Sequence, residues 1–176
     1  MLKSEIRKER EAQILSRLNK LGVSGVWELM ALNAGGLGSG GRRNAHRVLS
    51  EMEEKDLINS TRKEIKIFCV AGRGFGHWEH RMMMNKFLIK KGLFDKAKIE
   101  PQVKINGQEF RPDFMIPLVN NPKTAKEWAY FEVDRKQKKK ANLEKIQRYK
   151  EFGLRLEVVC TPERASMWKG CVIHEI

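Results

Sequence analysis

Apolar positions in the first third of the chain recur every three to four residues, which is the spacing of amphipathic helices. Ile14, Leu18 and Leu21 fall on one face in this way. Gly22 and a glycine-rich turn at residues 35–41 separate the helical segments. The pattern predicts three helices, over residues 9–22, 24–33 and 42–55.

The segment after the third helix has a strand pattern instead. Residues 57–60 and 64–70 are rich in β-branched and aromatic side chains, and the basic turn 61–63 joins them, so they predict a hairpin. Three helices followed by a hairpin is the order of a winged helix-turn-helix. In that arrangement the third helix enters the major groove of DNA and the hairpin, or wing, contacts the flanking backbone. The glycines of residues 71–76 mark the predicted end of this unit.

The second half alternates between strand and helix patterns, in the order α-β-β-β-α-β followed by a short helix and a strand. Its first turn is Asn106-Gly107, a two-residue hairpin signal. We therefore expect an α+β or α/β protein, with a winged helix-turn-helix domain over residues 1–75 and a second domain over residues 76–176. The elements predicted for the second domain are helices over 78–91 and 140–152 and strands over 103–105, 110–116, 128–134, 154–160 and 171–176.

The third predicted helix carries its charges in the order that its own dipole disfavours. Basic side chains crowd its N-terminal end and acids crowd its C-terminal end. This order suggests that the cations face phosphate, with Asn44 and His46 as candidates for base-edge contacts. The candidate DNA-binding residues on this helix are Arg42, Arg43, Asn44, His46 and Arg47. Phosphate contacts are also predicted for Arg62 and Lys63 on the wing and for Lys138, Lys139 and Lys140 in the second half.

The overall charge points to a nucleic-acid partner. The formal net charge is +13, and residues 1–75 contribute 14 Lys and Arg against 9 acids, residues 76–176 contributing 21 against 13. An excess of this size favours a polyanion through phosphate contacts and counterion release. Double-stranded DNA is therefore the expected partner, with no cofactor required for binding. A membrane surface is not expected, because no strongly amphipathic basic helix is present.

Three features of the sequence predict a cytoplasmic protein. No apolar run is long enough for a transmembrane helix. Residues 1–8 are charged and lack the apolar core of a signal peptide. Cys69, Cys160 and Cys171 form no C-x-x-C pair, which is typical of buried thiols in a reducing compartment and argues against a zinc site.

Three acids in the second half are candidates for metal chemistry. Asp113 falls in the second predicted strand of that half, and Glu132 and Asp134 share one face of the third, because side chains two apart point the same way along a strand. If the two strands are neighbours, the three carboxylates can converge. Oxygen ligands of this kind suit Mg²⁺ or Mn²⁺, which activate water in phosphodiester hydrolysis.

The same residues carry a resemblance to known families. Pro112-Asp113 followed by Glu132 one strand later, in the order α-β-β-β-α-β, resembles the restriction-endonuclease-like PD-(D/E)xK fold. More closely, a winged-helix half followed by "RPDFMI", "YFEVDR" and "KIQRYKEF" resembles the replication-relaxation family of plasmid and mobile-element proteins. The resemblance implies a DNA-binding protein that acts in replication, transfer or transcriptional control of a plasmid, phage or other mobile element. Asp113 then matches the Pro-Asp acid and Glu132 the (D/E) acid.

One departure from that motif bears on activity. The lysine expected two positions after Glu132 is Asp134, which removes a cation that offsets charge in the transition state. Lys136 or Lys138 can reach back from the following loop, and Glu79 can add a ligand. The favoured interpretation is a nuclease-like domain without catalysis. The alternatives are a Mg²⁺-dependent DNA endonuclease targeted by its winged helix, with Asp113, Glu132 and Lys136 as catalytic residues, and a module for homodimerisation or for recruiting a relaxase or replication protein.

Overall fold

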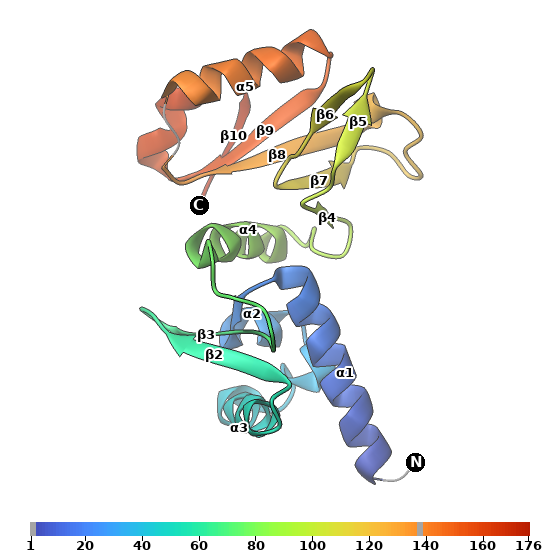
Figure 1. The fold of residues 1–176 in the computed structure, drawn as a ribbon, viewed down its shortest axis with the longest axis vertical. Coiled ribbons are helices and arrows are strands. Elements are labelled where there is room, and N and C mark those ends of the chain that lie inside the picture. Colours follow the sequence, from blue (N-terminus) through green and yellow to red (C-terminus); the bar gives the residue numbers. More distant parts are fainter. Residues whose placement is uncertain (1–2, 137–138) are drawn as a thin grey trace. The chain divides into compact units, whose positions relative to one another are not determined.

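The computed structural model describes residues 3–136 and 139–176 and shows a mixture of helices and sheets. The chain divides into two compact units, Met1–Ile89 and Lys90–Ile176 (Figure 1). This α+β organisation is the coarse class that the sequence predicts. Within the described residues, no helix has the length and apolar character needed to cross a membrane.

The first unit places helices around a small antiparallel sheet of order β1-β3-β2. Strands β2 and β3 form the predicted hairpin, whose outermost pair is Arg62 with Lys66. The helices bury the apolar faces that their periodicity predicts: Ile14, Leu18 and Leu21 are fully buried on α1. The elements of the unit are α1 Lys3–Leu21, β1 Ser24–Gly25, α2 Val26–Ala31, η1 Ala34–Gly36, α3 Gly41–Glu54, β2 Ile58–Arg62, β3 Lys66–Val70 and α4 Trp78–Lys90.

Strand β1 is an element that the sequence pattern assigns to a helix. Ser24 pairs with Phe68 and Gly25 with Ile67, so that β1 adds a third strand beside the hairpin. Gly25 then caps α2, because its backbone N–H donates a 3.0 Å hydrogen bond to Oε2 of Glu28. Two residues of strand are too short to show a period of their own, so only the pairing with β3 reveals it.

Helix α4 belongs to the first unit, whereas the predicted domain boundary at residues 75 and 76 assigns it to the second. Its side chains Trp78 and Met82 pack against a buried cluster that includes Val23 and Ile67. Asn85 is fully buried and donates from Nδ2 to the carbonyl oxygen of Val23 at 2.8 Å. The glycine-rich segment 71–76 is thus a connection inside the first unit, and the division falls between residues 89 and 90.

The second unit is built on a mixed five-stranded sheet of order β10-β9-β8-β7-β4. Strand β7 runs antiparallel to β8, while β8, β9 and β10 are parallel. Helix α5 connects β8 to β9 and packs against the sheet (Figure 1). The elements are β4 Lys98–Ile99, β5 Val103–Ile105, β6 Gln108–Phe110, β7 Phe114–Pro117, η2 Ala125–Glu127, β8 Trp128–Asp134, α5 Lys139–Glu151, β9 Arg155–Cys160, η3 Pro162–Trp168 and β10 Val172–Glu175.

The predicted strand over residues 110–116 is split in two. Its first residue ends β6, which pairs with β5 across the Asn106-Gly107 turn, and its later part is β7 in the main sheet. Arg111-Pro112 lies between them, and proline has no N–H to donate to a ladder. The break lets the chain leave the β5–β6 hairpin and enter the main sheet just before Asp113.

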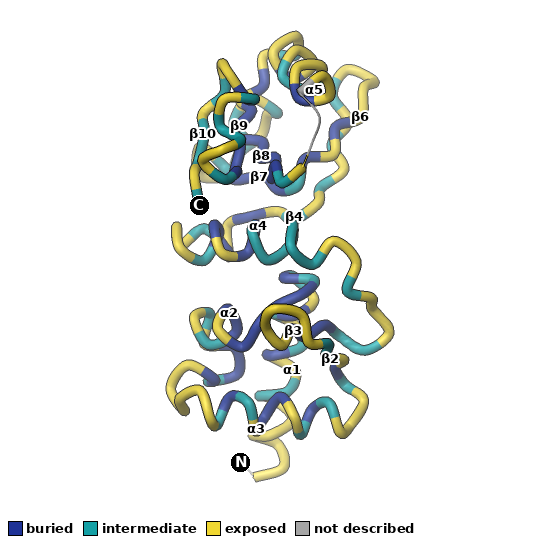
Figure 2. The backbone as a smooth tube through the Cα atoms, turned by 90° about the vertical axis from the view of Figure 1, so that its left-hand side faces the viewer, coloured by how far each residue is buried: buried dark blue, intermediate teal, exposed yellow. Residues whose placement is uncertain are grey.

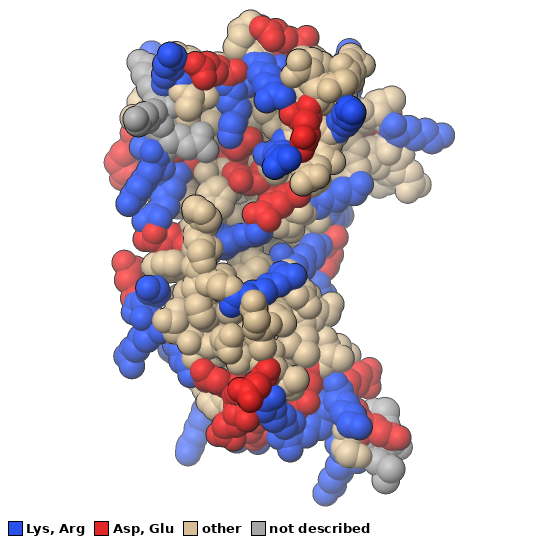
Figure 3. Space-filling model, in the orientation of Figure 1, with Lys and Arg blue, Asp and Glu red and all other residues tan. Residues whose placement is uncertain are grey.

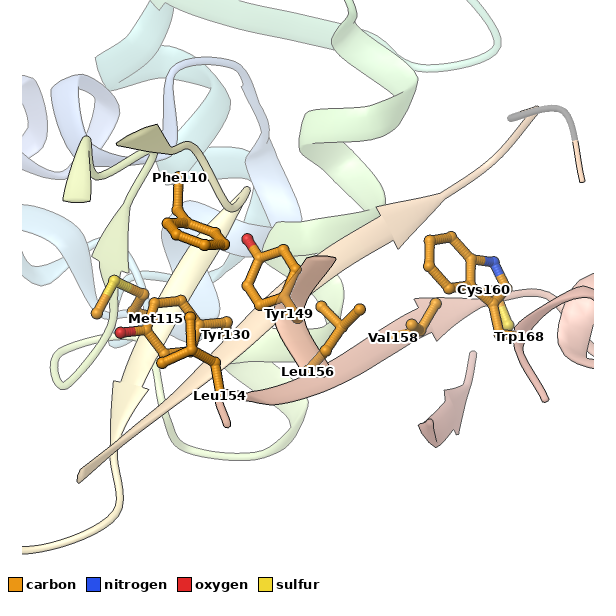
Figure 4. Packing of buried hydrophobic residues seen from close by; sticks show 9 residues of the cluster. All are labelled: Phe110, Met115, Tyr130, Tyr149, Leu154, Leu156, Val158, Cys160 and Trp168. Atoms are coloured by element: carbon orange, nitrogen blue, oxygen red, sulfur yellow. The ribbon is translucent and has the colours of Figure 1, made fainter. Parts of the chain in front are cut away.

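The core of the second unit packs aromatic residues between α5 and the sheet. Phe110, Tyr130 and Tyr149 contact one another edge to face, with ring centroids 5.2 Å apart for Phe110 and Tyr149 and 5.5 Å apart for Tyr130 and Tyr149. Trp168 is fully buried at the other end of the same cluster (Figure 4). Figure 2 shows buried backbone running along β8 and β9, which form the centre of the sheet. These strands therefore hold their acidic residues within a packed interior.

Replacing Asn85 by alanine tests the assignment of α4 to the first unit. The change leaves carbonyl oxygens of the β1 region without a donor in a buried site, which costs about 1–3 kcal/mol. Hydrogen exchange followed by mass spectrometry should show faster exchange in residues 14–34 and 58–70 and unchanged exchange in residues 128–160. Lys86→Ala, an exposed change one residue along α4, serves as the control; equal acceleration in both parts of the chain would contradict the assignment.

Candidate nucleic-acid interface and carboxylate pocket

Helix α3 presents a basic, solvent-facing side opposite its buried face. Ala45, Val48, Leu49 and Met52 are buried, whereas Arg43 and Arg47 are exposed on the other side. Within the described part of the chain, Arg42, Arg43, Arg62 and Lys63 make no ion pair with a carboxylate. Arg47 differs, because its guanidinium contacts Glu51 Oε1 at 2.5 Å and Asn44 Oδ1 at 3.0 Å. Arg43 is therefore the least constrained cation on the predicted recognition face.

The acids at the C-terminal end of α3 have partners from other elements. Glu51 also accepts from Arg7 of α1 at 2.8 Å, and Glu53 contacts Ser60 and Lys66 of the hairpin, the lysine at 2.9 Å. The Ser60 hydroxyl and the Lys66 ammonium hold the pKa of Glu53 below its ordinary value. These contacts join α3 to α1 and to the wing, so the acids act in holding the unit together. They also explain why acids lie where the helix dipole disfavours them.

Two predicted DNA-binding residues of α3 lie on its flank and line a groove. Arg42 and His46 share this groove with residues of α2, the wing and α4, and its cavity volume is about 780 Å³. We call it the Trp27 groove, and its lining includes Trp27, Met30, Arg42, His46, Arg62 and Lys86. Trp27 is 60% exposed. On α2 it lies off the buried face that Val26 and Leu29 form.

The acids Asp113 and Glu132 come together where β7 begins beside β8. Antiparallel pairing of Phe114 with Phe131 brings the residues beside them into adjacent positions. Oδ2 of Asp113 accepts a 2.7 Å hydrogen bond from the backbone N–H of Val133. Glu132 is 2% exposed, and Oε2 of its carboxylate contacts the Nζ of Lys145 at 2.7 Å. Buried Glu132 and half-buried Asp113 thus form a pair with one lysine beside it.

The electrostatics of the pair favour a shared proton or a bound cation. Burial, together with the neighbouring charge of Asp113, raises the pKa of Glu132 to about 7 against the lowering effect of Lys145. Oε1 of Glu132 is buried and has no hydrogen-bond partner among the described residues. An orphaned carboxylate oxygen beside a second carboxylate fits a divalent cation, because Mg²⁺ is commonly held by one or two carboxylates and water. Asp113 and Glu132 are the residues that would hold it.

A pocket opens over Glu132, with a cavity volume of about 590 Å³. Its basic wall comes from α5 and from the end of β6: Lys145, Arg148 and Arg111 all line it. Arg148 lies over the Phe110 ring at 4.7 Å, and Arg111 pairs with Glu109 at 2.5 Å. The carboxylate pocket, as we call it, therefore combines the buried carboxylate of Glu132 with cations at a scale suited to a phosphate group.

Asp134 does not join this pair, although the sequence predicts it as a third metal ligand. It is fully buried and accepts hydrogen bonds from Nε1 of Trp168 at 2.5 Å and from Nδ2 of Asn142 at 3.3 Å, and Nε of Arg164 lies 3.1 Å away. Its charge is thus neutralised by residues of α5 and η3. Across residues 3–136 and 139–176, no group of three or more His, Cys, Asp and Glu is placed to hold a metal ion.

The lysine beside the acids is also different from the predicted one. Lys136 is exposed and does not line the carboxylate pocket, whereas Lys145 reaches Glu132 from the next helix. No sequence signal singles out Lys145 among its neighbours, because its place depends on how α5 packs over β8. Lys140 is exposed, with its Nζ 4.0 Å from Oε1 of Glu144. Lys138 and the side chain of Lys139 lie outside the described residues, and Glu79 lies on α4 of the first unit.

Charged residues of both signs cover the visible face of each unit. Figure 3 shows Lys and Arg interspersed with Asp and Glu rather than gathered in one uniform patch on this face. Comparison of the chain with protein-family models, curated proteins and solved structures finds no match. The resemblance to the replication-relaxation family therefore stays a prediction, and the function is inferred from the geometry of the two sites.

The raised pKa of Glu132 predicts that stability falls as pH rises. The folded pKa, about 7, lies above the ordinary value of 4.5, so the native state binds this proton more tightly than the unfolded state. The free energy of unfolding is then highest below pH 4.5 and decreases up to about pH 7. In Glu132→Gln, which cannot titrate, this decrease should be smaller by up to about 3 kcal/mol, measured by urea unfolding at pH 5 and pH 8. Glu151→Gln, an exposed change on α5, should keep the wild-type dependence, and the same pH dependence in all three proteins would refute the buried-acid assignment.

Proposed function

We propose that the protein binds duplex DNA through its first unit, with α3 in the major groove and the β2–β3 wing against the flanking backbone. The observation that carries this proposal is the exposed basic side of α3 together with the cations Arg62 and Lys63 on the neighbouring hairpin. Phosphate contacts fix register and orientation on the duplex, and side chains of the helix read base edges. Arg43 and Arg47 are the leading phosphate or base contacts on α3.

The topology of the first unit supports this proposal. Helix, strand, helix, helix and hairpin follow one another, and β1 pairs with β3 beside the wing. We infer from this order a winged helix-turn-helix, an arrangement in which the third helix is open to the major groove of DNA. Asn44 already accepts a hydrogen bond from Arg47, so His46 on the flank is the better candidate for a further base contact.

We assign the second unit a nuclease-like role on its topology. The support is a helix-connected parallel pair, β8-α5-β9, next to antiparallel β7 and β4, with Asp113 and Glu132 beside one another on adjacent chain segments. Action at a plasmid, phage or other mobile element, and partners such as a second copy, a relaxase or a replication protein, follow from the family resemblance alone. They are expectations that accompany the DNA-binding proposal.

Removing the two outward cations of α3 tests duplex binding. Arg43→Ala/Arg47→Ala should weaken binding to a DNA fragment and reduce the dependence of log K on log salt by about 1.8, since each lost phosphate contact removes about 0.9 from the slope. Fluorescence anisotropy at several salt concentrations measures both quantities. Lys150→Ala/Lys169→Ala, which removes two exposed cations of the second unit, is matched in charge. Unchanged affinity in the α3 variant would exclude this helix as the contact.

Glu53, an acid at the C-terminal end of α3, is unsuitable as a control for loss of charge on this helix. Its carboxylate contacts Ser60 and Lys66 and so holds the wing against α3. A change at Glu53 disturbs the wing as well as the charge. Glu54 is exposed at the same end of the helix and is the better choice.

A second candidate function is metal-dependent cleavage of DNA at the carboxylate pocket. The favouring observation is Lys145, which puts a cation 2.7 Å from Glu132 although the motif position holds Asp134. When bound, Mg²⁺ or Mn²⁺ would activate a water molecule and neutralise phosphate charge. Asp113 and Glu132 would hold the ion, Lys145 would orient Glu132 and stabilise negative charge, and Arg111 and Arg148 would bind the phosphate backbone.

A plasmid-nicking assay separates this candidate from a domain without catalysis. With Mg²⁺ or Mn²⁺ at pH 8, where Glu132 is ionised, the wild type should nick supercoiled DNA and Asp113→Ala should not. Lys145→Met should slow nicking about a hundredfold, as loss of a preorganised electrostatic group does, and Lys136→Met should match the wild type. If the wild type does not nick DNA with either ion, catalysis is excluded while duplex binding by α3 stands.

A further inference from the structure

The Trp27 groove contains an exposed aromatic surface that binding to a DNA backbone does not require. Trp27 is 60% exposed, and Ile65 at the tip of the wing is 49% exposed. Both residues line the same groove. Phosphate contacts need cations and hydrogen-bond donors, whereas exposed large apolar side chains that gather in one recess mark a binding site.

The border of the groove is cationic. Arg42, Arg62 and Lys86 line it and, within the described residues, pair with no carboxylate. Glu28 also lines it, but this acid is 6% exposed and accepts a hydrogen bond from the backbone N–H of Gly25 at 3.0 Å. Its charge is therefore already engaged with the cap of α2, and Glu64 is the remaining exposed acid. The charge that the groove offers to a ligand is predominantly positive.

The size of the groove suits a nucleotide. Its volume of about 780 Å³ lies within the ~300–1,000 Å³ typical of small-molecule sites. An aromatic face bordered by arginine and lysine is the combination by which proteins hold unpaired nucleotides, because the base stacks on the ring and the cations follow the backbone. A purely apolar peptide segment would leave the arginines without partners, so charge complementarity favours the nucleotide.

We propose that the Trp27 groove receives an unpaired base, so that the protein prefers a junction between duplex and single-stranded DNA to continuous duplex. The α3 side of the first unit binds the duplex arm, and Trp27 stacks on a base of the adjoining single strand. Arg42 and Arg62 hold the phosphates at the point where the strands separate. This inference rests on duplex binding by α3, since α3 and the wing form two of the walls of the groove.

The test compares three labelled DNA probes with the same duplex sequence: a blunt duplex, a duplex with a 3′ or 5′ overhang, and a fork. Anisotropy titrations should show tighter binding of the fork and of one overhang than of the blunt probe. Trp27→Ala should weaken fork binding by about five- to 150-fold, the range of base stacking on an aromatic residue, and change blunt-duplex binding by less than twofold. Trp27→Phe should retain the preference, and the fork should quench tryptophan fluorescence in the wild type more than in Trp27→Phe.

Ile6→Ala is the matched control, because Ile6 is 49% exposed on α1 of the same unit and does not line the groove. It should bind all probes as the wild type does.

If Trp27→Ala weakens binding of the blunt and forked probes equally, or leaves the fork preference intact, the stacking proposal is overturned. If the variant changes no DNA affinity but abolishes self-association in sedimentation experiments, the groove takes a second copy instead. The Arg43→Ala/Arg47→Ala variant distinguishes the two proposals. If it loses duplex binding while Trp27→Ala, added to it, still weakens fork binding, then α3 and the groove contribute separately to DNA binding.

Discussion

The burial of Glu132 beside Asp113 constrains the rest of the second unit. Two carboxylates in a poorly hydrated site repel one another and lose hydration, so such a pair persists only where cations, donors or a proton compensate. The backbone N–H of Val133 satisfies one acid and Lys145 the other. This requirement couples the register of β7 and β8 to the rotation of α5, because Lys145 reaches the pair only if its side of the helix faces the strand.

Asp134 and Glu132 are two buried acids on the same strand that differ in how fully their oxygens are hydrogen-bonded. Asp134 lies two residues beyond Glu132, yet Arg164, Trp168 and Asn142 surround it completely. The partners use the bonding capacity of such a buried charge, and removing any one of them leaves the charge uncompensated. Glu132 instead keeps one buried oxygen without a partner and lines an open pocket. The distinction between the two acids is therefore one of unsatisfied bonding capacity.

In the first unit, the distribution of ion pairs leaves a basic surface open. Glu51 and Glu53 hold α1 and the wing against α3, and they thereby use the acids that would otherwise weaken a positive field. Arg42 and Arg43 at the other end of the helix have no such partners within the described residues. The helix therefore has free cations at its N-terminal end and paired acids at its C-terminal end, an arrangement that suits docking against phosphate. The cations of the wing extend the positive field over the Trp27 groove.

The sequence alone predicted the features that depend on local periodicity and on charge. These include the apolar face of α1 with Ile14 and Leu18, the β2–β3 hairpin, the exposed arginines of α3 and the adjacency of Asp113 and Glu132. Helical and strand periods record which face is buried, and exposed side chains stay exposed unless a partner covers them. The tertiary structure alone decided the place of α4, the burial of Asp134 among its own partners, the contact of Lys145 with Glu132 and the exposure of Trp27. Each of these depends on contacts between residues far apart in the chain, whose register and packing no local pattern encodes.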